Sequence, residues 1–176
     1  MSSLAVYLHT SPEMPDKVLT HPEDIAATLA EAGVRFERLP AVAVQAGASR
    51  EELLAACAAT IGQISQAQGY AGVEVLSVER KNPQREEPRA ERRQDAAAAH
   101  WFVAGRGLLS LHIGERVYAL QCERNDLVST PAGAGYWFDM GEAPHVALIT
   151  LSAGSHSHAA SLTGDDIASR FPGLDD

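Results

Sequence analysis

The chain has 176 residues, of which 45% are hydrophobic, and its formal net charge is −9 at pH 7. This length suits one domain with a sizeable core, and the negative charge argues against nucleic acid or an anionic membrane as the main partner. No apolar run approaches the roughly 18–20 residues of a membrane-spanning helix. Two cysteines without metal-type spacing, Cys57 and Cys122, and an N-terminus without a secretory pattern predict a cytoplasmic protein.

Two helices are predicted in the N-terminal part of the chain. Thr20 with Glu23, and Ser49 with Glu52, have the spacing of capping boxes, which mark helix starts. Gly69 is expected to end the second helix because glycine readily adopts the left-handed conformation. Short strands are expected before, between and after the helices, at residues 4–8, 34–39 and 73–78.

Short strands are predicted to dominate the rest of the chain. The polar stretch 82–97, which contains Pro83 and Pro88, is interpreted as a loop. Glycine-containing turns separate the segments that follow, and residues 163–166 are expected to begin a short C-terminal helix. The predicted strands lie at residues 98–104, 108–113, 116–121, 127–130, 136–139 and 146–151. Such closely spaced strands indicate a small β-barrel or a jelly roll.

The segment that ends at Tyr136 resembles the second sequence motif of cupins, G-x5-P-x-G-x2-H. Pro131 and Gly133 stand at the motif positions, whereas Asn125 replaces the first glycine and Tyr136 replaces the histidine. That histidine is a metal ligand in cupin metalloenzymes, so the resemblance implies the frame of such a site with a phenol at one ligand position.

The first cupin motif, H-x-H-x3-E-x6-G, shows the same kind of departure. At these spacings the chain has Arg92, Gln94, Ala98 and Gly105, so only the final glycine remains. A guanidinium, an amide and a methyl group cannot replace two imidazoles and a carboxylate as ligands of a divalent ion. The two motifs therefore predict the fold better than they predict a reaction.

Over almost the whole chain, the sequence is similar to bacterial acireductone dioxygenases. The similar segments are residues 33–38, 82–84, 111–114, 122–127, 137–141 and 163–169. The resemblance implies a mainly β fold, the cupin double-stranded β-helix or jelly-roll barrel, with N-terminal helices packed outside it and a short C-terminal helix. It also implies one cupin domain over residues 1–176. Its parts are N-terminal strands and helices (1–81), a loop (82–97), the main motif strands (98–151) and a C-terminal segment (152–176).

That family uses iron or nickel to oxidise an enediol of methionine salvage with molecular oxygen. The positions of its metal ligands correspond to Arg92, Gln94, Ala98 and Tyr136. An arginine of the family corresponds to His100, a second arginine to the vicinity of Thr150, and a pocket tryptophan to His158. Because side chains of one strand face recur every second residue, His100 is expected to face the barrel interior if residues 92, 94 and 98 do.

These positions give the predicted site, which needs no metal and no cofactor. His100 and Tyr136 are the predicted catalytic residues, as an acid/base and a proton donor. The predicted substrate-binding residues are Arg92, Gln94, Phe138 and His158. Simpler readings remain open for several of them, because His100 and Tyr136 could be packed interior residues, Arg92 could reach solvent and Phe138 could be part of the core.

Three functions are compatible with this pattern. We favour a metal-independent enzyme, an isomerase, cyclase or lyase acting on an enolisable polar substrate. Three of the four changed positions carry polar side chains, and a buried polar group without a partner lowers the stability of the fold, so a role in binding a ligand would explain them. One alternative is a non-catalytic small-molecule-binding or regulatory cupin. The other is a metal-dependent dioxygenase with rearranged ligands, for which His156 and His158 have suitable H-x-H spacing. A small molecule is the expected partner, and the oligomeric state stays open.

Overall fold

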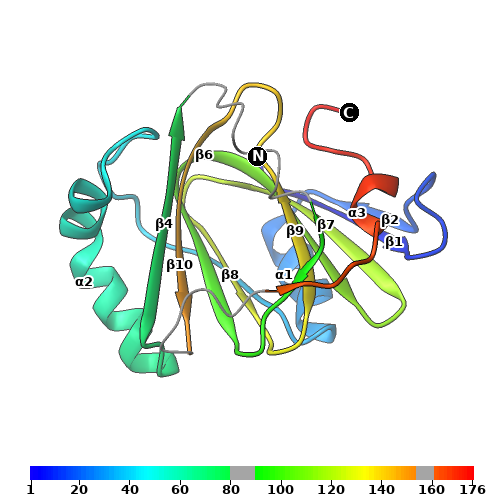
Figure 1. Ribbon diagram of the computed structural model, residues 1–176, viewed down its shortest axis with the longest axis horizontal. Helices are drawn as coiled ribbons and strands as arrows, with labels where there is room; N and C mark the ends of the chain where they lie inside the picture. Colours follow the sequence, from blue (N-terminus) through cyan, green and yellow to red (C-terminus); the bar gives the residue numbers. More distant parts are fainter. Residues whose placement is uncertain (80–89, 154–160) are drawn as a thin grey trace.

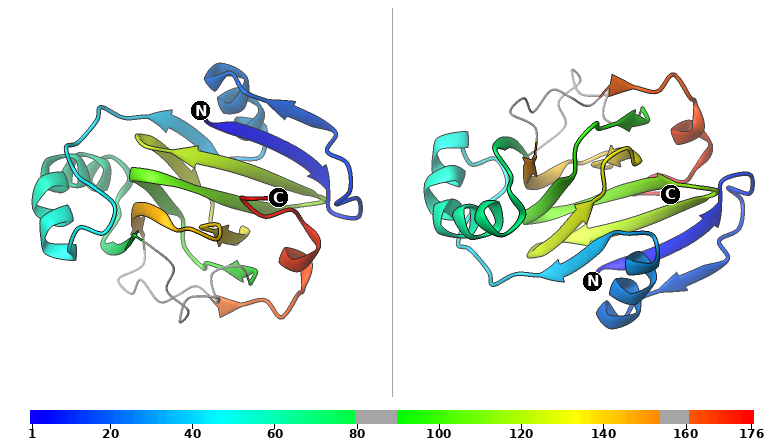
Figure 2. Two further views of the ribbon diagram at one scale, coloured as in Figure 1. Left: turned by 90° about the horizontal axis from the view of Figure 1, so that it is seen from above. Right: turned by 90° about the horizontal axis from the view of Figure 1, so that it is seen from below.

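Two antiparallel sheets that share one strand form the body of the molecule. The computed structural model describes residues 1–79, 90–153 and 161–176. The shared strand is β6 (Ala98–Ile113), and the two sheets curl around a common interior (Figures 1 and 2). The mainly β architecture expected from the sequence is confirmed.

Each sheet has a simple strand order within the described residues. One sheet runs β11 (Ser161–Leu162), β5 (Arg92–Arg93), β9 (Gly135–Asp139), β6, β7 (Arg116–Glu123), β1 (Ser3–Leu8) and β2 (Lys17–Leu19). The other runs β4 (Gly72–Glu79), β10 (His145–Ser152), β6, β8 (Asp126–Thr130) and β3 (Arg35–Arg38). Strands from distant parts of the sequence are therefore neighbours around the interior.

Gly105 allows β6 to pass from one sheet into the other. Its φ is +72°, and a Cβ atom at this position would lie 1.8 Å from the carbonyl oxygen of His145. Only glycine fits so close an approach of two backbones. The sequence predicted two strands, 98–104 and 108–113, with a turn between them. The structure instead has one continuous strand, because Gly105 bends the chain without ending its hydrogen bonding.

Helices α1 (Pro22–Glu31), α2 (Arg50–Gln68) and α3 (Ile167–Arg170) lie outside the sheets, and α2 runs beside β4 (Figure 1). The backbone N–H of Glu52 donates to Ser49 Oγ at 3.1 Å, and Gly69 ends α2 in the left-handed conformation. Both predicted ends of α2 are therefore confirmed.

The predicted start of α1 is wrong in its capping. His21 is the N-cap residue, and no side chain caps the helix. Pro22 occupies the first helical position, where its missing N–H costs nothing and its φ already suits the helix. The helix consequently begins without the hydrogen bond that the spacing of Thr20 and Glu23 suggested.

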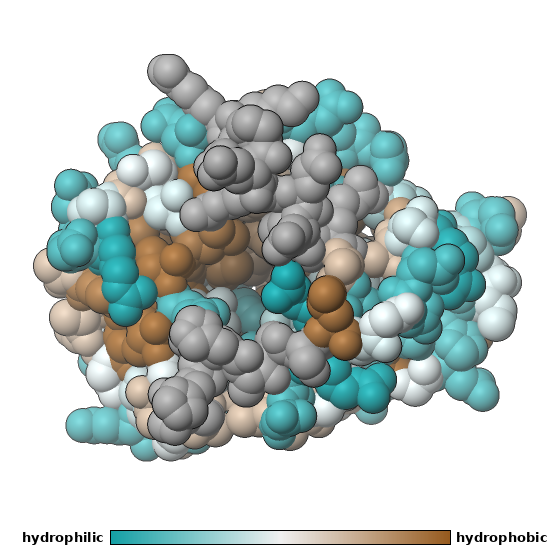
Figure 3. All heavy atoms as spheres, in the orientation of Figure 1, coloured by the Kyte–Doolittle hydropathy of each residue, from teal (hydrophilic) through white to brown (hydrophobic). Residues whose placement is uncertain are grey.

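Apolar side chains form three layers. The first fills the space between the sheets and extends under α1, and it includes Phe102, Leu111, Phe138 and Leu148. The second joins the outer face of β4 and β10 to α2, where apolar atoms also reach the surface beside β4 (Figure 3). The third lies on the outer face of the other sheet and includes Tyr7, Trp137 and Phe171, with Phe171 at the end of α3. Fully burying such a side chain contributes about 1.5–3 kcal/mol.

Two strands of two residues each among the described residues, β5 and β11, have no clear signal in the sequence. Strand β5 lies within the stretch predicted as a loop, 82–97, and pairs with both β9 and β11. A two-residue strand is too short to show alternation, so only its partners reveal it. No helix in the described part of the chain is long and apolar enough to cross a membrane.

Candidate functional site

Alternation along four strands brings a set of polar side chains to the interior between the sheets. On β4, Leu76 and Val78 belong to the interior layer, whereas Val73 and Val75 pack toward α2. Since successive side chains point to opposite faces, Glu74 faces the interior as well. Thr150 shares its face of β10 with Leu148 and lies opposite Glu74 in the strand pairing.

His100 is buried at the centre of this polar set. It pairs with Thr150 across β6 and β10, and its Nδ1 lies 3.3 Å from Thr150 Oγ1. Its side chain is 4% exposed, and its Nε2 atom has no hydrogen-bond partner among the described residues. Burial lowers the pKa of His100 to about 4, so the imidazole is neutral at pH 7. A neutral imidazole with one unused nitrogen can give or accept a hydrogen bond with a ligand hydroxyl.

Tyr136 lies against His100, with ring centroids 5.8 Å apart. Burial raises the pKa of the Tyr136 phenol, while the charge of Arg92 lowers it and that of Glu74 raises it. The phenol therefore keeps its proton at neutral pH and can donate it in a hydrogen bond. Arg92 pairs with Tyr136 across β5 and β9, so a guanidinium stands beside the phenol.

The other predicted positions that the structure describes are all buried. Gln94 is buried, and its backbone oxygen accepts a hydrogen bond from Gly133 N at 2.8 Å. Phe138 is buried in the apolar part of the interior, 5.9 Å from the ring of Phe102. Ala98 is fully buried. His158 lies outside the described residues, as does His156. Among the predicted residues that are described, direct relationships join Arg92 to Tyr136 and Tyr136 to His100.

Glu74 and the role of Thr150 were missed from the sequence. The available signal for Glu74 was its position as the acidic residue in the apolar stretch 73–78, in phase with Leu76 and Val78. For Thr150, the pairing of β10 with both β4 and β6 was needed, because no local pattern connects residues 74, 100 and 150.

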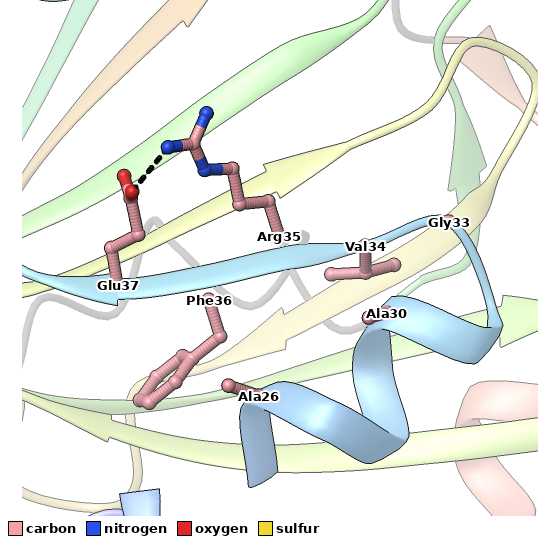
Figure 4. Close-up of a pocket in the computed structure, with 7 residues that line it drawn as sticks. All are labelled: Ala26, Ala30, Gly33, Val34, Arg35, Phe36 and Glu37. Atoms are coloured by element: carbon pink, nitrogen blue, oxygen red, sulfur yellow. Dashed lines mark hydrogen bonds and ion pairs between the residues drawn. The ribbon is translucent and has the colours of Figure 1, made fainter. Parts of the chain in front are cut away.

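A separate groove lies on the outside of the barrel, between α1 and β3. It is lined by Ala26, Ala30, Gly33, Val34, Arg35, Phe36 and Glu37. Its edge carries an exposed ion pair, in which Arg35 donates to Glu37 at 2.5 Å (Figure 4). None of the predicted site residues that the structure describes borders this groove.

The described residues contain no ready metal centre. Across 1–79, 90–153 and 161–176, no group of three or more His, Cys, Asp or Glu side chains is arranged to hold a metal ion. The interior site is therefore built from a guanidinium, an imidazole, a phenol, a hydroxyl and one carboxylate.

Comparison with known proteins identifies the family. The model of the ARD/ARD′ family matches residues 8–156. The chain belongs to this family. It is 54% identical to an acireductone dioxygenase of Pseudomonas paraeruginosa, 53% to one of Pseudomonas aeruginosa and 51% to one of Pseudomonas fluorescens, and in each comparison the whole of both chains is covered.

A solved structure supports the fold. An acireductone dioxygenase from Bacillus anthracis, with a cadmium ion in its active centre, matches with a TM-score of 0.72 over 91% of this chain and 95% of its own. The sequence identity is 19%, so this likeness bears on the fold alone. The predicted cupin-type fold is confirmed.

The preferred functional prediction is wrong. We expected a metal-independent isomerase, cyclase or lyase with a degenerate metal site, on the strength of four changed positions. Relatives more than half identical over their full length are named as dioxygenases, which favours the alternative of a metal-dependent dioxygenase. Four changed side chains are a smaller part of the sequence than the similarity that extends over the entire chain.

Proposed function

We propose that this chain binds an acireductone, which is an enediol, in the barrel interior and takes part in its oxidation by molecular oxygen. The observation that carries the proposal is the 54% identity to an acireductone dioxygenase over the full length of both chains. The polar set around His100 supports it, because a purely apolar interior would offer nothing to the hydroxyl groups of an enediol.

The proposed roles follow from charge and protonation. Arg92 supplies a permanent positive charge for an ionised enediol oxygen. Tyr136 keeps its proton and donates a hydrogen bond to a second oxygen, next to the neutral His100. His100 then exchanges a proton with the substrate through Nε2, the nitrogen for which the described residues offer no hydrogen-bond partner.

The remaining predicted residues have supporting roles in this proposal. Gln94 offers a neutral amide to the polar end of the ligand, and Phe138 forms part of the apolar wall. His158 is proposed as a further contact of the substrate, although it lies outside the described residues. Glu74 adds a carboxylate whose charge acts on Tyr136, so an anionic group of the ligand is expected to lie nearer Arg92 than Glu74.

The side chains at the positions compared with the family's ligands do not fit iron or nickel. Arg92 has no lone pair to offer, Gln94 and Tyr136 are neutral and weak donors, and Ala98 has none. We therefore propose that these four positions do not ligate a metal in this chain, and we assign no step of the reaction to one. A metal ion that served the reaction in this chain would need ligands other than these four.

Oxygen consumption with an acireductone tests the proposal. Protein without a histidine tag is assayed as purified, after dialysis, and after addition of Fe²⁺ or Ni²⁺, and its metal content is measured by elemental analysis. We expect oxygen uptake faster than the spontaneous reaction and a loss of about 10²–10⁴-fold in His100→Gln, the range of general acid–base catalysis. Acireductone binding without oxygen uptake in any form would refute the proposed oxidation and favour the binding-protein alternative.

A further inference from the structure

A second cluster of titratable side chains lies on the outer face of the sheet that contains β5, β6 and β9. His112 on β6 and His9, just after β1, approach each other, with His112 Nε2 3.3 Å from His9 Nδ1. On the other side of the same imidazole, His112 Nδ1 lies 2.7 Å from a carboxylate oxygen of Glu91. The proposed substrate site does not use any of these three residues.

The cluster is on the opposite side of the sheet from the barrel interior. Tyr7 and Trp137 belong to the outer apolar layer, and Leu111 belongs to the interior one. Because side chains alternate, His9 shares the outer face with Tyr7, and His112 points away from the side of Leu111. The cluster is therefore separate from His100 and Tyr136.

Glu91 is buried beside His112 and has further contacts of its own. Its side chain is 2% exposed, and its second oxygen accepts a hydrogen bond from Thr163 Oγ1 at 2.7 Å. It rests against Gly135, where a Cβ atom would come within 2.8 Å of the carboxylate. A buried carboxylate that already has a hydroxyl donor takes the Nδ1–H of His112 as its second donor.

This hydrogen bond fixes the tautomer of His112. With its proton on Nδ1, the imidazole presents the lone pair of Nε2 toward His9. A carboxylate that orients a histidine from behind is the arrangement commonly found around protein metal ligands. The side chain of His112 is 17% exposed to solvent, so an ion can reach it.

The separation of the two nitrogens matches a tetrahedral metal. Two imidazole nitrogens bound to Zn²⁺ at about 2.0–2.1 Å and at a tetrahedral angle are about 3.3 Å apart. The observed distance between His9 Nδ1 and His112 Nε2 is 3.3 Å. The rings are tilted by 53° to each other, and His9 is only half-buried, so its side chain has room to turn its Nδ1 toward an ion held by His112.

We propose that His9 and His112 form a two-histidine site for a divalent transition ion such as Zn²⁺, with Glu91 as the residue that orients His112. Without metal, His9 donates its Nδ1–H to His112. On binding, the proton of His9 moves to its Nε2, and water fills the remaining coordination positions. No third His, Cys, Asp or Glu from the described ranges completes a protein cage, so the site is open and its ion exchangeable.

Cobalt titration followed by visible absorption, with Zn²⁺ as competitor, tests the proposal on protein without a histidine tag. We expect one saturable site in the wild type, no such site in His9→Ala, and binding weakened about 10–100-fold in Glu91→Gln, the usual effect of losing an orienting partner. His21→Ala removes an exposed histidine away from the cluster and should bind like the wild type. Added Zn²⁺ should also raise the melting temperature of the wild type but not that of His9→Ala.

Two outcomes would overturn the proposal. Equal Co²⁺ binding by wild type and a folded His9→Ala would mean that any bound ion is elsewhere, including the barrel interior. A wild type that binds no Co²⁺ or Zn²⁺ would mean that the two imidazoles only bond each other. His112→Gln, which retains a polar side chain for Glu91, gives a second test if it folds as judged by circular dichroism.

Discussion

The imidazole of His100 and the phenol of Tyr136 lie 5.8 Å apart between ring centroids, with planes inclined by 47°. The two residues are 36 positions apart in the chain. His100 lies in the half of β6 that pairs with β10 and β8, whereas Tyr136 on β9 pairs with Leu111 in the other half of β6. Burial acts on both groups in the direction of the neutral form, lowering the pKa of His100 and raising that of Tyr136. A ligand at this place therefore meets two neutral hydrogen-bonding groups and the charge of Arg92.

Replacing Tyr136 with Phe should weaken acireductone binding without disturbing the packing. A hydrogen bond to a charged group contributes about 1.5–3 kcal/mol, so the dissociation constant should rise about 10–150-fold. Anaerobic isothermal titration calorimetry measures it directly. Tyr7→Phe is the matched control, because Tyr7 packs against Phe171 on the outer face; equal affinities for the two variants would exclude the proposed role of the phenol.

The burial of His100 should make stability fall in mild acid. In the unfolded chain the imidazole titrates near 6.5, whereas in the folded protein the pKa is about 4. Between these values the unfolded state binds a proton that the folded state does not, so the free energy of unfolding decreases as pH falls through this window. From pH 7.5 to pH 5 the loss due to His100 should be about 2 kcal/mol.

Urea unfolding at the two pH values, for the wild type and His100→Gln, isolates this contribution. The decrease in the free energy of unfolding from pH 7.5 to pH 5 should be about 2 kcal/mol smaller in His100→Gln than in the wild type, because the variant has no titrating imidazole at this position. His21→Gln removes an exposed histidine and should retain the wild-type dependence. Identical pH dependences in wild type and His100→Gln would contradict the shifted pKa.

Helix α2 should depend on its cap, whereas α1 should not. Ser49→Ala removes the side-chain oxygen that accepts from Glu52 N and should cost about 1 kcal/mol of unfolding free energy. Thr20→Ala changes a residue with the same apparent motif but no capping bond, so its cost should stay within about 0.5 kcal/mol. Chemical denaturation of both variants makes the comparison, and equal losses would argue against the assigned caps.

Gly105 should tolerate alanine much less than Gly33 does. Both have positive φ, which costs an L-residue about 1–2 kcal/mol, but nothing lies within 4 Å of a Cβ atom at Gly33. At Gly105 the added atom meets the backbone of β10, which adds an overpacking cost of about 1–3 kcal/mol. Thermal and urea unfolding should therefore show that Gly105→Ala is clearly less stable than Gly33→Ala. A similar loss of unfolding free energy in both variants would mean that the backbone of β10 moves easily to accommodate the added methyl group.

Much of the fold could be predicted because its signals are local. The cap at Ser49, the end of α2 at Gly69 and the run of strands each depend on neighbouring residues, and the structure contains them, except that the strands predicted at 98–104 and 108–113 are one strand, β6. Strand β5 and the capping of α1 could not be predicted, since the first is defined by its partners in the sheet. At α1, His21 is the N-cap and Pro22 the first helical residue, one residue later than the capping-box spacing of Thr20 and Glu23 suggested.

The candidate site was only partly accessible from sequence for the same reason. The family resemblance, which placed residue 98 at the interior, and alternation from residue 98 to residue 100 led to the expectation that His100 faces the barrel interior, and its burial agrees with that expectation. Glu74 and Thr150 reach His100 only through the pairing of β4, β10 and β6, which is a property of the folded sheet. The cluster of His9, Glu91 and His112 likewise joins three strands or strand ends that no short motif connects.

The sharing of β6 by both sheets limits how the interior can be reached. A single covalent strand crosses from one sheet to the other at Gly105, next to the backbone of His145. The two sheets therefore cannot swing apart like the halves of a hinge without breaking the hydrogen bonds of this strand. We therefore expect a molecule to reach His100 without a hinge motion of the two sheets.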